Sequence, residues 1–306
     1  MIPVLRRWFC LLTALLLFLS CALGEETPAE ELPVYPPMEY DLDIPGKRVY
    51  DTYVSDTLRF TIETFHMEGN KCVLTEVWVQ DPGRQIRKVN ADWGKDLANP
   101  KDLARKLPEA VLATNASGYV TRTYPDIPAS YPGKPADYYF TTLGSLVITD
   151  GEILRELDGV PFYGLALTGE GISMYRGADN ADVLAASPSQ TWAFFESCAM
   201  QENGADLLPE EGTWPMAKEK HARTLLARVN RNNYLLLHLP YGPALRGMSL
   251  YRLNQFFSEH FETEWVYNRD GGYSTSLVYR QQKKKSALFL LVPNVQKIAD
   301  LLCFTE

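Results

Sequence analysis

The sequence of 306 residues predicts an α+β fold, a large and mostly antiparallel β-sheet core with a few packed helices. Two observations predict it. Runs of alternating apolar and polar residues recur along the chain and are joined by short glycine-containing turns, as in β-hairpins. From Glu109 onward the pattern is mostly β, and helical periodicity is confined to a few stretches, so a sheet dominates the expected core. The turns recur too irregularly for a solenoid or a propeller.

The first 24 residues have the pattern of an export signal peptide. Arg6 and Arg7 form its basic start, residues 9–19 its apolar stretch, and residues 22–24 a cleavage site of small residues. The apolar stretch is short for a membrane span. Two alternatives remain open: a lipoprotein attached at Cys21, and an uncleaved leader that tethers the chain to a membrane. In each case the rest of the chain is expected to be extracytoplasmic, secreted or associated with the cell envelope.

The chain is acidic, with a formal net charge of −8 that becomes more negative by two when the leader and its two arginines are removed. Phosphate backbones are held by clustered Lys and Arg side chains, so no nucleic acid is expected as a partner. The basic run Lys283-Lys284-Lys285 is typical of a solvated turn between strands. Cys72, Cys198 and Cys303 remain after cleavage and permit at most one internal disulfide, so disulfides are not expected to stabilise the fold.

Residues 25–46 are rich in Pro and Glu and are expected to form a disordered linker, which leaves residues 47–306 as the folded domain. The domain begins with two alternating runs, residues 50–64 and 71–80. They flank Glu68-Gly69-Asn70, and this arrangement predicts a hairpin.

The middle of the chain begins with a predicted helix. Asn99 followed by Pro100 indicates its start, because proline is favoured at the first helical position, and the helix is expected to end near Lys106. The elements predicted after it are a strand over 111–115, hairpins over 145–155 and 164–175, a short helix over 179–186, a strand over 190–196, and a pair of strands over 223–229 and 234–239.

A longer helix is strongly indicated near the C-terminus. Ser249 can accept a hydrogen bond at its start. The apolar residues that then fall on one face are Leu250, Leu253, Phe256, Phe257 and Phe261, a stripe typical of packing against a sheet. A strand over 264–267 follows and carries Asp270 at its C-terminal end. Further strands are expected at Val278 and over 288–292, and a helix over 295–302 is expected to close the domain.

Residues 267–276, Tyr-Asn-Arg-Asp-Gly-Gly-Tyr-Ser-Thr-Ser, interrupt two apolar, strand-like runs. Gly271 and Gly272 allow positive φ angles and a close approach of the backbone to a ligand. The Asp270 carboxylate and the nearby hydroxyls can converge on one polar group, and the end of a strand holds such a group rigidly. The alternative is a plain hairpin turn, for which Asp-Gly alone is enough.

The order of these features resembles the phosphodiester glycosidase family. Near its end, that family has a Pro-Arg-Thr strand, a hairpin, a Gly-Met-Thr-Leu helix start and then Leu-Asp-Gly-Gly-Gly-Ser-Ser. The corresponding residues here are Ala222-Arg223-Thr224, the hairpin to Pro240, Gly247-Met248-Ser249-Leu250 and Arg269-Asp270-Gly271-Gly272-Tyr273-Ser274-Thr275. An earlier Asn-Gly-Gly loop of the family corresponds to Asn115-Ala116-Ser117. The resemblance covers residues 111–279 and implies the same α+β fold.

The resemblance also implies a hydrolase that cleaves glycosyl phosphodiesters (sugar-1-phosphate esters) in cell-envelope or surface glycans. Breaking the bond at the anomeric carbon places positive charge on the sugar ring, which a carboxylate can stabilise. Asp270 is the candidate carboxylate. Arg223 is the candidate cation for the phosphate, provided that their two strands are neighbours. The candidate substrate-binding residues are Asn115, Thr224, Gly271, Gly272 and Ser274.

Each of these residues can also have a purely structural role. Asp270 can cap its own loop, Arg223 can form a cross-strand ion pair, and Asn115 and Ser274 can hydrogen-bond the loop backbone. Departures from the family pattern keep a second hypothesis open, a non-catalytic carbohydrate-binding or envelope-scaffold protein on the same fold. These departures are Tyr273 in place of the third glycine, Ala116 in place of the first glycine of the earlier loop, and Glu196 within a segment that is often Phe-Gly-Pro.

No metal ion and no cofactor is expected. His66, His221, His238 and His260 do not have the spacing of metal ligands, and the sequence lacks both a Gly-x-Ser-x-Gly elbow and a P-loop. The resemblance implies a glycan or sugar-phosphate substrate as the partner.

Overall fold

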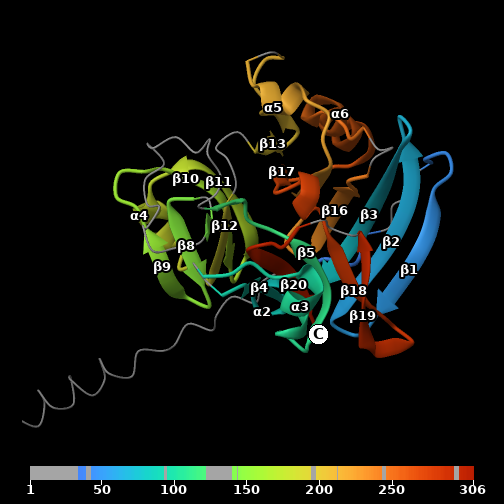
Figure 1. Cartoon of the computed structure of the whole chain (residues 1–306), viewed down its shortest axis with the longest axis horizontal. Helices are drawn as coiled ribbons and strands as arrows, with labels where there is room; N and C mark the ends of the chain where they lie inside the picture. The colour runs from blue at the N-terminus through green and yellow to red at the C-terminus, as the bar shows by residue number, and fades with distance from the viewer. Residues whose placement is uncertain are drawn as a thin grey trace, which may run out of the picture. The chain divides into compact units, whose positions relative to one another are not determined.

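Two antiparallel sheets form the centre of the structure, a computed structural model that describes residues 34–38, 43–92, 95–121, 140–142, 144–193, 198–211, 213–242, 246–292 and 296–306 (Figure 1). These residues belong to one unit, Val34–Glu306. The expected signal peptide, residues 1–24, lies outside the described residues. All strand pairs among the described residues are antiparallel, so the predicted α+β class with a large antiparallel sheet is confirmed.

The larger sheet has eight strands. Their spatial order is β1 (Arg48–Val54), β2 (Leu58–Met67), β3 (Asn70–Val79), β16 (Asn233–Leu239), β15 (Arg223–Arg228), β17 (Trp265–Arg269), β13 (Ala199–Glu202) and β14 (Ala205–Asp206). The second large sheet has five strands, in the order β19 (Lys284–Val292), β18 (Leu277–Gln281), β5 (Ala110–Asn115), β20 (Asp300–Thr305) and β4 (Ile86–Asn90).

Smaller sheets and short helices complete the described part of the chain. The three-stranded sheet has the order β11 (Gly171–Ala178), β10 (Phe162–Thr168) and β12 (Gln190–Ala193), and two strand pairs are β6 (Tyr119–Thr121) with β7 (Phe140–Thr142) and β8 (Leu146–Thr149) with β9 (Glu152–Glu156). The helices are α2 (Pro82–Gln85), α3 (Pro100–Arg105), α4 (Asn180–Ala185), α5 (Pro215–Lys218), α6 (Leu250–His260) and the 3₁₀ turn η1 (Gly272–Ser274). None of the helices in the described residues is long and apolar enough to span a membrane.

Alternate residues of β16 face two different cores. Tyr234 and Leu236 lie in the core that residues of the two large sheets share, whereas Leu235 and Leu237 lie in the core that the eight-stranded sheet shares with α6. Because successive side chains of a strand point to opposite faces, a strand buried on both faces reads as a continuous apolar run. The helix α6 therefore covers the face of the eight-stranded sheet that is turned away from the five-stranded sheet.

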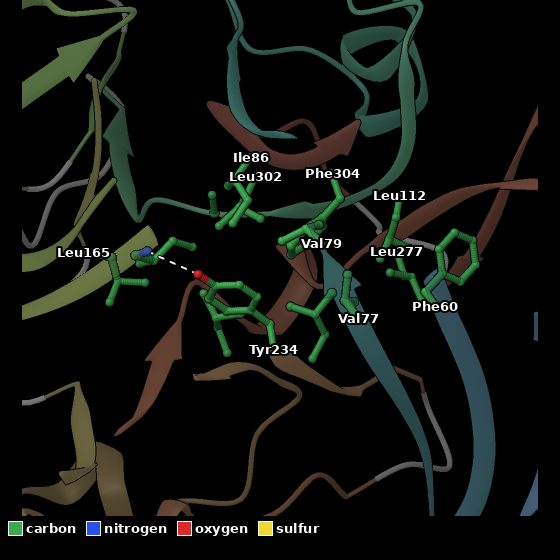
Figure 2. Close-up of a cluster of buried hydrophobic side chains, with 14 of the residues drawn as sticks. Phe60, Val77, Val79, Ile86, Leu112, Leu165, Tyr234, Leu277, Leu302 and Phe304 are labelled. Carbon is green, nitrogen blue, oxygen red and sulfur yellow. Dashed lines mark hydrogen bonds between the residues drawn. The ribbon is translucent and has the colours of Figure 1, made fainter. Parts of the chain in front are cut away.

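The shared core also joins the three-stranded sheet to the rest of the fold. The hydroxyl of Tyr234 accepts a hydrogen bond from the backbone N–H of Ile172 in β11 (3.2 Å) and donates one to the carbonyl of Arg231 (3.0 Å). Figure 2 shows this bond among the apolar side chains of β3, β5, β18 and β20. A buried tyrosine hydroxyl is thus satisfied while its ring packs in the core.

Ser249 begins α6 as the sequence predicts. Its hydroxyl accepts a hydrogen bond from the backbone N–H of Arg252 (3.3 Å), three residues into the helix. The five residues of the predicted apolar stripe are all buried. The short helix α3, the strand β5 and the hairpin β8–β9 also lie within a residue or two of their predicted bounds, and the hairpin β10–β11 extends two residues before and three residues beyond its predicted bounds.

The helix expected over residues 295–302 is wrong. Asp300–Thr305 forms β20, which lies between β5 and β4 in the five-stranded sheet. Leu302 and Phe304 face the core between the two large sheets, whereas Leu301 and Cys303 face α3. A short apolar run buried on both faces has no alternation that distinguishes it from a buried helix, and this ambiguity explains the error.

The run of residues 50–64 is also not one strand. It divides at residues 55–57 into β1 and β2, and β2 pairs with β3 through the expected turn at Glu68-Gly69. The strand β4 and the short strands β13 and β14 were not predicted. The predicted strand over 190–196 is observed as β12 up to Ala193, and its remaining residues lie outside the described part of the chain.

Part of the expected linker is described and contacts the eight-stranded sheet. The side-chain oxygen of Asn232 accepts a hydrogen bond from the backbone of Tyr35 (2.9 Å), and that of Asn233 accepts one from the backbone of Met38 (3.0 Å). The indole N–H of Trp78 donates to the carbonyl of Tyr35 (2.7 Å). Residues 34–38 therefore lie along β3 and the start of β16.

Candidate active site

Three strand ends meet at one end of the eight-stranded sheet. The first residue of β15, Arg223, pairs with Leu239 at the end of β16. On the other side of β15, Thr224 pairs with Arg269 at the end of β17. The chain therefore leaves β17 at Asp270 directly beside the start of β15, so the two strands that carry Asp270 and Arg223 are neighbours.

Asp270 is partly exposed to solvent although it lies deep among other groups of the protein. Burial raises the pKa of its carboxyl group from the ordinary 3.8 to about 7. The Ser274 hydroxyl, the Gly271 backbone N–H and the positive charge of Arg269 limit this rise, whereas the negative charge of Asp300 adds to it. A carboxyl group with this pKa changes its ionisation near neutral pH, as a group that transfers protons must.

Asn115 connects the Asp270 loop to two other segments. Its side-chain N–H donates to the backbone carbonyl of Asp270. Its side-chain oxygen accepts from the hydroxyl of Thr224 (3.1 Å) and from the backbone N–H of Ser276 (2.9 Å). Asn115 and Thr224 are fully buried. The structure therefore brings both residues next to Asp270, where their hydrogen bonds hold the loop in place.

Ser274 is also used within the loop. Its hydroxyl accepts a hydrogen bond from the side-chain amide of Gln296 (2.7 Å), and it lowers the pKa of the nearby Asp270 carboxyl group. The side chain is fully buried. Because the hydroxyl accepts the bond from Gln296, its single proton is available for donation to a carboxylate. Ser274 thus favours the ionised form of the candidate acid.

Gly271 is required by the close approach of two backbones. A Cβ atom at this position would lie 2.6 Å from the carbonyl oxygen of Ala222 and 3.2 Å from the Cα atom of Arg223. The next residue, Gly272, has a φ of +58° and open space at its Cβ position. Its backbone N–H donates to the carbonyl of Ala222 (2.9 Å). The two positions therefore require glycine for different reasons, close packing at Gly271 and a positive φ angle at Gly272.

The Arg223 guanidinium is buried and turned toward backbone carbonyls. Its Nη2 donates to Met216 (2.6 Å) and Glu219 (2.9 Å), and its Nε donates to Met248 (3.4 Å). Among the described residues, Nη1 makes no hydrogen bond, and no ion pair joins Arg223 to Asp270. Burial lowers the pKa of Arg223 to about 10, so it stays charged at neutral pH.

Three buried charges that the sequence analysis did not select lie around Asp270. Arg269, 2% exposed, donates to the backbone carbonyl of Asn115. Asp300, 1% exposed, forms an ion pair with Lys88 (3.4 Å). Ser117 donates to Asp300 from its backbone N–H (2.7 Å) and its hydroxyl (2.6 Å). Two cations and two acids therefore share this region, which compensates charges that would otherwise be costly to bury.

Charges inside apolar runs are the signal by which these residues could have been found. Arg269 ends the buried strand β17, Lys88 lies within β4, and Asp300 opens β20. A charged residue in a buried strand needs a partner of opposite charge. The sequence does not show which distant strand supplies it.

The positions that depart from the family pattern have separate environments. Tyr273 is 49% exposed and packs against Tyr241, with 4.3 Å between ring centroids and 3.0 Å between hydroxyl oxygens. Ala116 is buried, and its carbonyl accepts a hydrogen bond from the backbone N–H of Asp270 (3.4 Å). Glu196 lies outside the described residues.

Comparison with known proteins gives matches to solved structures. No family model and no curated protein matches the chain. The structure is similar to the zebrafish N-acetylglucosamine-1-phosphodiester alpha-N-acetylglucosaminidase catalytic domain, with a TM-score of 0.61 and 16% identity over 85% of this chain and 87% of that chain. It is also similar to a hypothetical protein from Synechocystis, with a TM-score of 0.52 and 12% identity over 86% of this chain and 64% of that chain. At these identities the similarity shows that the chain shares the fold of this glycosidase catalytic domain.

Proposed function

We propose that this chain is an exported hydrolase that cleaves glycosyl phosphodiesters in glycans of the cell envelope or cell surface. The observation that carries the proposal is the environment of Asp270, a partly exposed carboxyl group at the end of β17 whose backbone is held by Asn115 and whose pKa burial raises to about 7. Perturbed acids held on rigid elements are characteristic of catalytic sites. The shared fold with a phosphodiester glycosidase catalytic domain supports the same reaction class.

The proposed reaction requires the ionised form of Asp270 next to the anomeric carbon of the sugar. Cleavage at the anomeric carbon develops positive charge on the ring, and the carboxylate stabilises this charge, attacks the carbon or activates water. The phosphate leaves as a stable anion and needs little proton donation. An ionised Asp270 is therefore more useful to this reaction than a protonated one.

The remaining candidates have three roles in this proposal. Asn115, Thr224 and Ser274 are buried and hold Asp270 in place rather than contacting the substrate. Gly271 and Gly272 let the backbone pass close to the start of β15. Arg223 can contact the phosphate only through Nη1, because its other guanidinium nitrogens bind backbone carbonyls.

The second hypothesis is a carbohydrate-binding protein that does not hydrolyse its ligand. The exposed Tyr273, which stands in the glycine motif beside Asp270, is the observation in its favour. This hypothesis predicts that a sugar phosphodiester binds and is released unchanged. The hydrolase hypothesis predicts release of the free sugar.

The test is incubation of the purified chain with methyl phosphodiesters of several sugar 1-phosphates, followed by quantification of the free sugar. We expect turnover with at least one sugar and a loss of about 10²- to 10⁴-fold in Asp270→Asn. The matched control is Asp158→Asn, because Asp158 is exposed in the turn between β9 and β10, and we expect it to keep the parent rate. Absence of turnover with every sugar, or equal rates for the two variants, contradicts the proposal.

A further inference from the structure

Two tyrosines from different loops form an exposed pair beside the candidate site. Tyr241 follows β16 and Tyr273 belongs to η1. Their rings are inclined at 57° with centroids 4.3 Å apart, and their hydroxyls are hydrogen-bonded at 3.0 Å. The side chains are 42% and 49% exposed, among the most exposed large apolar residues of the described part of the chain.

The strand register places this pair at the same end of the sheet as Asp270. Tyr241 comes two residues after Leu239, which pairs with Arg223 on one side of β15. Asp270 comes one residue after Arg269, which pairs with Thr224 on the other side of β15. Tyr273 is three residues after Asp270 and reaches Tyr241 across this strand end. The two rings therefore flank the start of β15 together with the candidate acid.

The contact between the rings restricts their motion before any ligand binds. Each ring packs against the other, and the hydroxyl bond adds a second constraint. Tyrosine presents a large rigid surface with few rotatable bonds, so little conformational entropy remains to be lost on binding. If the two rings packed together only to stabilise the fold, they would be expected to be buried. About half of each residue remains exposed instead.

We propose that Tyr241 and Tyr273 form a subsite that stacks against a pyranose ring of the substrate, next to Asp270. A pyranose has an apolar face of C–H groups and a rim of hydroxyls, which match an aromatic face and a phenol oxygen respectively. This inference deepens the proposed function by naming the class of ring that the site binds. The inference rests on the proposed function in one respect, that the bond to be cleaved lies beside Asp270.

The test measures binding without turnover. The chain carrying Asp270→Asn is titrated by calorimetry with two probes: α-N-acetylglucosamine-1-phosphate methyl ester, which has one pyranose, and the corresponding diester with O6 of methyl α-glucoside, which has two. Tyr241→Ala and Tyr273→Ala are added singly to this background. Tyr50→Ala is the matched control, because Tyr50 is 52% exposed on the distant strand β1.

We expect each alanine variant at the pair to weaken binding at least tenfold, while Tyr273→Phe and Tyr50→Ala stay within threefold of the parent, since phenylalanine keeps the ring. Weakening with both probes assigns the pair to the sugar that is released. Weakening with the two-pyranose diester alone assigns it to the leaving group. Equal affinities in the alanine variants and the parent, or no binding of either probe to the parent, overturn the subsite.

Hydrolysis separates failure of the subsite from failure of the proposed function. In chains that retain Asp270, the alanine variants are expected to raise KM about tenfold and to leave kcat within threefold, because the contact is made before and during the reaction. Tyrosine-dependent binding in a chain that hydrolyses neither these probes nor any of the other sugar esters would support the subsite and contradict the hydrolase. Hydrolysis with an unchanged KM in both alanine variants would support the hydrolase and contradict the subsite.

Discussion

The side-chain amide of Asn115 donates a hydrogen bond to the backbone carbonyl of Asp270, 155 positions later in the sequence. This bond joins the five-stranded sheet to the eight-stranded sheet. The oxygen of the same amide accepts bonds from Thr224 and Ser276. One buried residue of the five-stranded sheet thus fixes the end of a strand in the eight-stranded sheet. The candidate acid is held by the joint between the two layers and not by its own loop alone.

Asn115→Ala is expected to destabilise the fold by about 2 to 4 kcal/mol, because it leaves a buried hydroxyl, N–H and carbonyl without their partner. Unfolding in urea measures the free energy change. Asn99→Ala is the comparison, since the Asn99 side chain is exposed and donates to Asp102 (3.3 Å). We expect that variant to cost about 1 kcal/mol or less. Similar costs for the two variants would show that the Asn115 bonds add little.

The two glycines of the loop are expected to tolerate alanine differently. Gly271→Ala places a Cβ atom against the Ala222 carbonyl, so the backbone must move. We expect the free energy of unfolding to fall by about 3 kcal/mol. Gly272→Ala meets no neighbouring atom and is expected to cost about 1 kcal/mol for its positive φ. Thermal and urea unfolding of both variants checks the order. A larger cost at Gly272 would contradict the close approach of the two strands.

Asp270→Asn is expected to stabilise the protein at alkaline pH. The folded-state pKa of about 7 is above the ordinary 3.8, so the folded chain keeps a proton that the unfolded chain has already lost. The resulting penalty grows between pH 4 and 7 and is constant above. Removing it should raise the free energy of unfolding by about 1 to 2 kcal/mol at pH 8, allowing for partial solvent exposure, and by little at pH 4. An equal effect at both pH values would rule out the raised pKa.

Local patterns predicted the elements whose signals lie within a few residues. Ser249 and the stripe from Leu250 to Phe261 define α6 completely, because a cap and one apolar face are local properties. The pattern of the last strand, β20, favours a helix, because burial on both faces removes the alternation that marks a strand. Asp270 and its neighbour strand could be anticipated from the motif order.

The direction of the Arg223 side chain could not be anticipated in the same way. It depends on the carbonyls of Met216 and Glu219, in the segment just before β15, and on that of Met248, 25 positions later in the chain, and no local pattern predicts these bonds. The ion pair of Lys88 with Asp300 likewise joins strands more than two hundred positions apart. Such pairings follow from sheet order, which the sequence alone does not specify.

Ser274→Ala is expected to raise the pKa of Asp270 above about 7, because the Ser274 hydroxyl favours the ionised carboxylate. Carbon-13 NMR titration of the aspartate carboxyl signals measures this directly and needs no substrate. Ser173→Ala, in β11, is the control and should leave the titration unchanged. A pKa that stays constant or falls in Ser274→Ala would mean that the hydroxyl does not donate to Asp270.

The pH dependence of kcat/KM for a sugar-1-phosphate methyl ester tests the central claim most directly. The phosphodiester does not titrate between pH 5 and 9, so changes in rate over this range report the enzyme. If the ionised Asp270 drives cleavage, kcat/KM should be constant above pH 7 and fall about tenfold per pH unit below the pKa near 7. A rate that is independent of pH from 5 to 9, or that falls only as pH rises, would contradict the account.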